Sequence, residues 1–166
     1  MIMKLPIGTI IDLSEVVNLI NSYEGLSDDG AIAIYENASE YEKLVKNEFV
    51  DKINGFVKKL QTEEYAELKE KTKDITDEEN EDLIRFKKLN EDAQEKINNY
   101  RDTLMNQEFE ITINTISHED LLAIVRNSDN RKKISRVGFR LIESLFVEKE
   151  AEETSEEIVE EEQIKE

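Results

Sequence analysis

The chain of 166 residues lacks cysteine and tryptophan altogether, and it has one proline, one histidine and five glycines. Without cysteine it can form neither a disulfide nor a zinc–thiolate site, and it has no thiol nucleophile. Aromatic residues make up only 7% of the chain, so the hydrophobic core should be modest. The length then fits a single domain rather than two.

Positive charge is also scarce, because 22 Lys and Arg oppose 40 Asp and Glu for a net charge of −18. Such a chain repels phosphate groups and anionic membrane surfaces, so nucleic acid is disfavoured as a partner and basic proteins are favoured. No apolar run approaches the roughly 20 residues of a membrane span. The first residues, MIMKLPIGTIIDL, contain Pro6, Gly8 and Asp12, which interrupt the apolar run of a signal peptide. We expect a mature protein without membrane association.

The acidic residues are most concentrated at the C-terminal end. Between Glu148 and Glu166 there are ten Glu and two Lys, a net charge of −8, and few apolar residues. Such a segment buries too little apolar surface to offset the entropy lost on ordering. The sequence therefore predicts one domain over residues 1–147 and a disordered acidic tail over residues 148–166.

The middle of the chain, between Gly30 and Gln107, has a single glycine, Gly55, and no proline. Its apolar residues recur at steps of three and four, which places them on one face of a helix. This pattern predicts a coiled-coil-like helical hairpin over residues 30–107. The first stripe comprises Tyr41, Val45, Phe49, Ile53, Phe56 and Leu60, and the second comprises Phe86, Leu89, Ala93, Ile97, Tyr100 and Leu104.

The length of the first helix decides the shape of the molecule. A helix from Gly30 to Lys71 would be about 60 Å long, whereas a compact domain of this size is roughly 40 Å across. We therefore expect the hairpin to project from a base. Gly55 follows Asn54 and costs about 1 kcal/mol relative to alanine in a helix, so a break there is the alternative, which would give a more compact bundle.

The two ends of the chain, residues 1–29 and 108–147, should form the base. Phe109, Ile111 and Ile113 alternate with polar residues, as in a strand with one buried face. A strand needs a hydrogen-bonding partner, and the other candidate is the segment Met3 to Leu5. The expected fold class is mainly α (α+β): a projecting antiparallel helical hairpin on a small base with a two-stranded sheet and short helices.

Two other helix starts carry a capping-box pattern. Asp12 is followed three residues later by Glu15, and Thr76 is followed by Glu79. In such a box the first side chain accepts from the third helical N–H, and the acid bonds back to the cap. We expect one helix to begin near Asp12 and the second arm of the hairpin to begin near Thr76.

The only histidine, His118, follows Ser117 and precedes Glu119 and Asp120. Ser117 is predicted to cap a helix whose first turn carries the two acids near the positive end of the dipole. A lone histidine could serve as a base or a metal ligand. Consecutive helical residues diverge by about 100°, however, so this run does not converge on a metal. We expect an exposed or capping histidine.

No other pattern indicates catalysis. The chain has no glycine-rich phosphate loop, nucleophile elbow or HExxH pattern. One acidic cluster lacks the alternating ligands and central glycine of a calcium loop; it comprises Asp74, Asp77, Glu78, Glu79, Glu81 and Asp82. The sequence therefore predicts no catalytic residue, no metal site, no cofactor and no enzymatic function.

One basic segment interrupts the acidic chain, with six cations in fifteen residues and Asp129 as the only acid. Its functional interpretation is a site for an anion or an acidic partner. The alternative is neutralisation of the protein's own acidic hairpin or tail, and the surrounding negative charge would weaken phosphate binding. Both interpretations stay open at this point. We call these residues the basic patch: Arg126, Arg131, Lys132, Lys133, Arg136 and Arg140.

The order of segments resembles that of small acidic proteins encoded by tailed bacteriophages of low-GC hosts. The stretches that carry the resemblance are KLPIGTIIDLSEVVNLI, NYRDTLMNQEFEITINTISHEDLLAIV and RLIESLF. It covers about residues 3–147 in layout and composition, departs from these proteins at the acidic tail and the basic patch, and transfers no functional residue. It implies a phage product in the host cytoplasm or the virion that acts by binding.

Two functional hypotheses follow. The first is a non-enzymatic phage protein that uses its hairpin to bind a phage or host protein or a second copy of itself, in assembly or as a minor virion component. The second is an acidic inhibitor that mimics DNA towards a host nucleic-acid enzyme. Its support is the net charge of −18 together with acids spaced along long helices.

Overall fold

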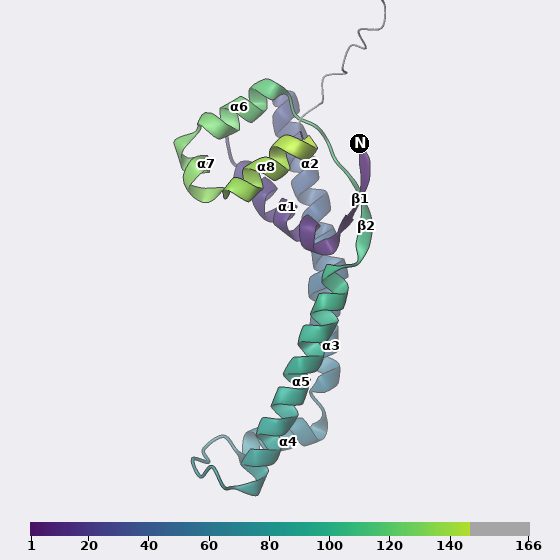
Figure 1. Cartoon of the computed structure of the whole chain (residues 1–166), viewed down its shortest axis with the longest axis vertical. Helices are drawn as coiled ribbons and strands as arrows, with labels where there is room; N and C mark the ends of the chain where they lie inside the picture. The colour runs from purple at the N-terminus through teal and green to yellow at the C-terminus, as the bar shows by residue number, and fades with distance from the viewer. Residues whose placement is uncertain (147–166) are drawn as a thin grey trace, which may run out of the picture.

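A computed structural model describes residues 1–146, so the predicted tail 148–166 lies outside the described residues. Figure 1 shows a base of short helices and a small sheet, from which a helical hairpin projects. The predicted fold class is confirmed. The elements are β1 (Ile2–Pro6), α1 (Ile7–Ile20), α2 (Asp28–Val45), the π-helical segment η1 (Lys46–Val50), α3 (Asp51–Leu60), α4 (Glu63–Lys71), α5 (Glu81–Met105), β2 (Glu108–Thr112), α6 (His118–Arg126), α7 (Ser128–Lys133) and α8 (Arg136–Phe146).

The sheet joins the two ends of the domain, as predicted. β1 and β2 are antiparallel, and Met3 lies opposite Ile111. Beyond the strands, the backbone N–H of Ile113 donates to the Met1 carbonyl at 2.7 Å. The Met1 amine donates to the Ile113 carbonyl at 2.9 Å. Residues more than a hundred positions apart are therefore held together at one side of the base.

Side chains of α2 take the place of a third strand along the other edge of β2. The Asn37 amide donates to the Asn114 carbonyl at 2.8 Å and accepts from the Asn114 N–H at 2.9 Å. Glu40 accepts from the Thr112 N–H at 3.0 Å. The Tyr41 hydroxyl donates to the Thr112 carbonyl at 3.1 Å. These bonds satisfy backbone groups at the edge of β2 and just after it that the two-stranded sheet leaves without a strand partner.

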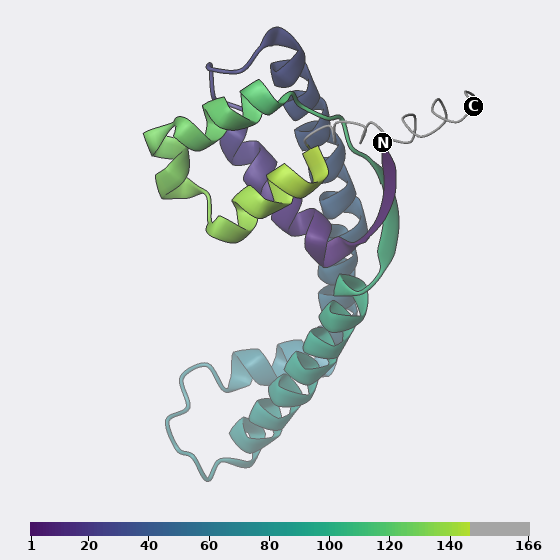
Figure 2. The ribbon, with the colours of Figure 1, turned by 45° about the horizontal axis from the view of Figure 1, so that its top comes forward.

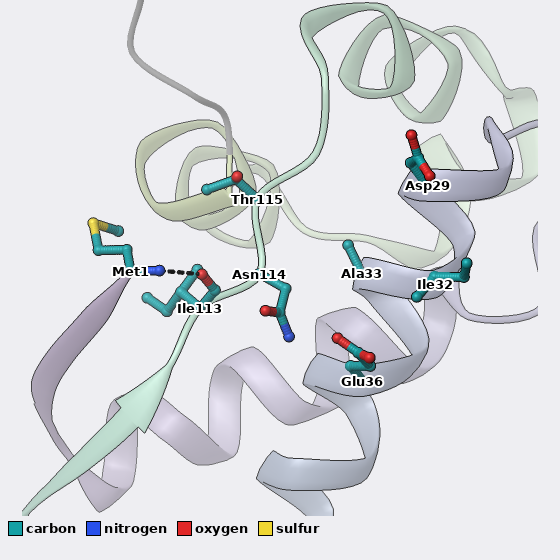
Figure 3. A pocket seen from close by; sticks show the side chains of 8 residues that line it. All are labelled: Met1, Asp29, Ile32, Ala33, Glu36, Ile113, Asn114 and Thr115. Carbon is teal, nitrogen blue, oxygen red and sulfur yellow. Dashed lines mark hydrogen bonds between the residues drawn. The ribbon is translucent and has the colours of Figure 1, made fainter.

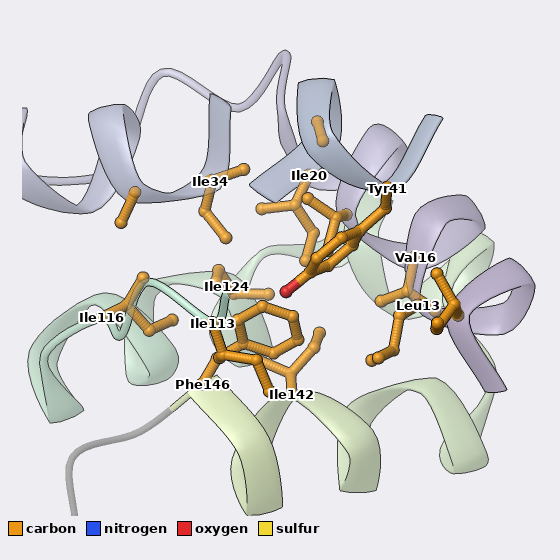
Figure 4. Packing of buried hydrophobic residues seen from close by; sticks show 14 of the residues in the cluster. Leu13, Val16, Ile20, Ile34, Tyr41, Ile113, Ile116, Ile124, Ile142 and Phe146 are labelled. Atoms are coloured by element: carbon orange, nitrogen blue, oxygen red, sulfur yellow. The ribbon is translucent and has the colours of Figure 1, made fainter. Parts of the chain in front are cut away.

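The hydrophobic core lies entirely within the base, where α1, α2, α6, α8 and the segment after β2 meet (Figure 4). The rings of Tyr41 and Phe146 approach with centroids 6.4 Å apart. Neither the core nor the side chains packed against it include any described residue between 50 and 108. Residues 30–49, at the start of the predicted hairpin, pack in this core, so the part that leaves the base is shorter than 30–107.

The projecting hairpin pairs α3 and α4 with α5, which run antiparallel (Figures 1 and 2). Phe56 stacks on Tyr100 with ring centroids 4.4 Å apart, and Tyr65 lies against Phe86 at 5.4 Å. α5 has 25 residues, which corresponds to about 37 Å at 1.5 Å per residue. The second half of the first predicted stripe therefore contacts the second stripe, whereas Tyr41, Val45 and Phe49 of the first stripe pack in the base.

The first arm does not break at Gly55, but the predicted single helix from Gly30 to Lys71 is wrong, because residues 61–62 separate α3 from α4. The helix passes through this residue, where an added Cβ would meet no atom within 4 Å. It ends at Leu60, and α4 begins after Thr62, whose hydroxyl accepts from the Tyr65 N–H at 3.2 Å. A cap that satisfies a free N–H favours a new helix start here, whereas the apolar stripe continues on both sides of Gly55.

The predicted start of the second arm at Thr76 is wrong. The helix α5 begins after Asn80, whose side chain accepts from the Leu83 N–H at 3.1 Å. Thr76 lies in the preceding loop, where the Asp77 carboxylate accepts from the Glu79 N–H at 3.0 Å. This local turn bond engages the Glu79 N–H, so the helix starts at the next strong cap.

The predicted start near Asp12 is also wrong, because α1 begins at Ile7 directly after the strand. Pro6 has a φ of −59° and lacks an N–H, so it ends the ladder without losing a helical hydrogen bond. Asp12 and Glu15 are exposed on the helix surface. None of the helices within residues 1–146 combines the length and the apolar composition needed to cross a membrane.

Candidate interaction surfaces

The basic patch lies on three successive short helices at one corner of the base (Figure 1). Arg126 ends α6, Arg131, Lys132 and Lys133 form the last turn of α7, and the two remaining arginines lie one turn apart in α8. All six side chains are exposed. The structure therefore places the predicted cations, all exposed, on three successive helices of the base.

This patch has little counter-charge within residues 1–146. Its one ion pair among these residues joins Lys132 to Asp129 of the same helix, at 3.6 Å and with both side chains largely exposed. Arg131 donates through Nε to the Val125 carbonyl at 2.6 Å, which holds the end of α6. Exposed pairs of this kind contribute at most about 1 kcal/mol. In the described part of the chain, no ion pair links the patch to the hairpin.

The opposite end of the molecule carries the acidic cluster. Residues 72–82, which we call the acidic tip, contain one Lys and six acids for a net charge of −5. They form the loop between α4 and α5 and the first residues of α5. Near the tip, Arg85 of α5 forms an ion pair with Glu64 of α4. Figures 1 and 2 show the tip at the far end of the hairpin from the base.

The Ser117 segment forms a structural clamp between α2 and α6. Ser117 caps α6 as predicted, and His118 is exposed. Asp120 is only 4% exposed and turns inward. It accepts from the Ser27 N–H at 2.7 Å, the Ser27 hydroxyl at 2.8 Å and the Ser117 hydroxyl at 2.8 Å. Since Ser27 caps α2, one carboxylate joins the N-terminal ends of two helices.

The environment of Asp120 favours its charged form. Burial raises the pKa of this carboxyl, but the hydrogen bonds from Ser27 and Ser117 outweigh burial and leave the pKa below its usual value. Gly30 is required for this arrangement, because an added Cβ would lie 2.5 Å from Asp120 Oδ2. The clamp therefore depends on a charge, two hydroxyls and a glycine.

Sequence reasoning did not identify this clamp. It placed Asp120 in the first turn of α6, which is correct, but nothing in the local pattern indicates the contact with Ser27, 93 residues away. The same is true of the Asn37 bonds to the backbone of Asn114, 77 residues away. The signal in the sequence was the uncharged amide of Asn37 within an otherwise apolar helical stripe. Such a residue indicates a buried polar group that needs hydrogen-bond partners.

A shallow pocket of about 340 Å³ lies between the start of β1, the segment after β2 and the outer face of α2 (Figure 3). Met1 and Ile32 contribute exposed apolar surface, with 58% and 56% of their area accessible. Asp29 and Glu36 line the same pocket. Within residues 1–146, no group of three or more acidic or histidine side chains is arranged to hold a metal ion.

No protein-family model, no curated protein and no solved structure matches this chain. The surfaces described above are therefore interpreted from their own geometry and charge. Three features stand out: the hairpin that projects from the core, the acidic tip at its end, and the basic patch on the base.

Proposed function

We propose that the protein is a non-enzymatic interaction protein that binds a protein partner through its helical hairpin. The observation that carries this proposal is the separation of the hairpin from the core. The core of the base is complete without any described residue between 50 and 108. Some forty residues of paired helix thus contribute no side chain to the core cluster of the base.

The hairpin has the surface that a helical binding element needs. Its apolar side chains are only partly covered, since no residue of α3 is fully buried and Leu104 is the only fully buried residue of α5. Partner proteins recognise such helices through apolar residues spaced three and four apart. The acidic tip adds a charge that favours a basic partner surface and speeds the encounter with it.

The resemblance in layout to small acidic phage proteins supports the biological setting of this proposal. A phage product of this kind would act in the host cytoplasm, in virion assembly or as a minor virion component. The exposed His118 and the structural role of Asp120 support a function without catalysis.

Site-specific photo-crosslinking in the cells that naturally produce the protein tests the proposal. A crosslinking amino acid is placed at Glu91 or Glu95, which are exposed on α5, and matched controls are placed at Asp12 or Glu15, which are exposed on α1. We expect discrete protein adducts from the α5 positions and few from the α1 positions. Adducts from α1 alone would contradict the proposal, and so would a complete absence of adducts from α5.

A second candidate is an acidic inhibitor that mimics DNA. It is supported by exposed carboxylates on two separate elements, including Asp28, Asp29 and Glu36 on α2 and the six acids of the tip. Such an inhibitor should compete with DNA for a basic enzyme surface, and salt should abolish the competition. A DNA-binding enzyme from the host whose activity is unchanged by excess protein at low salt would count against it.

A further inference from the structure

We propose that a partner of the hairpin is a second copy of this chain, packed antiparallel so that each acidic tip faces the basic patch of the other copy. This inference rests on the proposed function, because it takes the hairpin as the binding surface. It adds the identity of the partner, its orientation, and a role for the basic patch.

The first argument is the incomplete burial of the hairpin. Two paired helices bury only the stripe between them, and both edges of that stripe stay open to solvent. The rings of Phe56 and Tyr100 stack at 4.4 Å, yet both side chains stay partly exposed. A second hairpin alongside would cover the open edge and complete a four-helix bundle, in which such stripes become fully buried.

The second argument is charge complementarity. The acidic tip has a net charge of −5, and the segment 126–140 that holds the basic patch has six cations and one acid, a net charge of +5. A parallel pair would place tip against tip and patch against patch, with repulsion at both ends. An antiparallel pair places opposite charges together at both ends, so charge selects the orientation as well as the partner.

The third argument is the shape of the molecule. In Figures 1 and 2 the tip and the α7 corner both lie on the left of the hairpin, so the molecule curves around that side. In a two-fold symmetric pair, a contact between the tip of one copy and the patch of the other is repeated at the opposite end. Such an interface is isologous and closes as a dimer.

Repulsion between two chains with a net charge of −18 each opposes this association. Salt at 0.1 M screens this repulsion beyond about 10 Å. The contacts between tip and patch act at shorter range and are therefore screened less. We therefore expect the dimer at near-physiological salt. High salt should weaken it, because it screens the exposed pairs as well.

The mass of the full chain in solution, measured by sedimentation and by light scattering, tests the inference. We expect twice the chain mass of 19.3 kDa. A tip variant and a patch variant each place like charges at both ends and should both be monomeric. The tip variant is Asp74→Lys, Glu78→Lys and Glu79→Lys, and the patch variant is Lys132→Glu, Lys133→Glu and Arg136→Glu.

Mixing the two variants provides the decisive measurement. The tip variant keeps the original patch, and the patch variant keeps the original tip, so a mixed pair retains one original contact and gains a second between a tip of net +1 and a patch of net −1. We expect an equimolar mixture to form a heterodimer although each variant alone stays monomeric. A control variant carries Asp12→Lys, Glu15→Lys and Glu24→Lys. It makes the same net-charge change as the tip variant, but on exposed positions of the base, and should stay dimeric.

The inference is overturned by a wild-type chain that is monomeric at all concentrations, by a dimer that survives both charge variants, or by a mixture that stays monomeric. A mass that keeps growing with concentration beyond twice the chain mass would indicate an open head-to-tail chain and would also overturn it. If the wild type is monomeric while the α5 positions still crosslink to another protein, the proposed function stands without self-association. If α5 crosslinks to nothing, the proposed function fails as well.

Discussion

Replacing Asp120 tests whether one buried carboxylate joins α2 to α6. In Asp120→Ala the Ser27 N–H loses its acceptor at 2.7 Å, which costs about 1–3 kcal/mol. The charge near two helix N-termini is lost too, at roughly 0.3–1 kcal/mol for each end. The two serine hydroxyls can turn to other partners, so we expect the free energy of unfolding to fall by about 3 kcal/mol.

The isosteric change Asp120→Asn separates charge from shape. The amide oxygen can still accept from the Ser27 N–H, so the loss should be about 1–2 kcal/mol, mainly the interaction of the charge with the two helix ends. Chemical denaturation followed by circular dichroism measures both variants at neutral pH. For a chain of this size 1 kcal/mol corresponds to about 2–4 °C in Tm, so Asp120→Ala should melt about 10 °C lower than wild type.

The pH dependence gives a second readout. The hydrogen bonds hold the pKa of Asp120 below its usual value in the folded state, so its contribution is fully present above the unfolded pKa of about 4 and is lost as the pH falls further. The stability difference between wild type and Asp120→Asn should therefore shrink in acid. Glu119→Gln, an exposed neighbour, is the control. If Asp120→Asn costs no more than this control at neutral pH, the clamp is refuted.

Other positions test the base and the hairpin separately. Tyr41→Phe removes the bond to the Thr112 carbonyl and should lower the free energy of unfolding by about 1 kcal/mol. Burial raises the pKa of Tyr41, so wild type should lose stability above about pH 10. Alkaline denaturation should therefore destabilise the variant less than wild type. Gly55→Ala should raise the free energy of unfolding by about 0.5–1 kcal/mol in chemical denaturation, since an added Cβ meets no atom within 4 Å. Phe56→Ala removes the stack on Tyr100 and should speed hydrogen exchange in α3 and α5 while the base keeps its protection.

Each of these expectations has a clear contrary result. Equal alkaline sensitivity of wild type and Tyr41→Phe would mean that Tyr41 ionises without opening the base. A destabilising Gly55→Ala would mean that the helix is strained at this position. If Phe56→Ala lowers protection in the base as much as in the hairpin, the two parts unfold together and the separation that supports the proposed function is lost.

Local patterns were sufficient to predict most of the architecture. Apolar residues at steps of three and four predicted the helices of the hairpin, and simple alternation predicted the strand at Phe109. Both patterns are visible in the sequence because each element buries one face. The pairing of the chain ends followed from the need of β2 for a partner. Ser117 was identified as a cap because its bond to the Asp120 N–H is local in sequence.

The features that were missed depend on competition or on distant contacts. The signal at Thr76 is a valid capping pattern, but Asn80 offers a stronger cap closer to the apolar stripe. A break at Gly55 was only the alternative, and the helix does pass through this residue; the end that was missed is at Leu60, before the cap at Thr62. The Asp120 clamp and the Asn37 bonds need the tertiary structure to bring their partners near, so no window of sequence contains them.

The pairing of Met3 with Ile111 also has a consequence for the order of folding. Closing a disordered loop of about a hundred residues costs about 2 kcal/mol more than closing one of about ten. When the hairpin forms first, by local contacts, it brings Gln107 close to the end of α2, halves the length of the disordered loop and lowers that cost by about 0.6 kcal/mol. We expect the hairpin to fold early and the sheet late. On the ribosome, β1 is made first but has to wait for its partner strand until the whole hairpin has been synthesised.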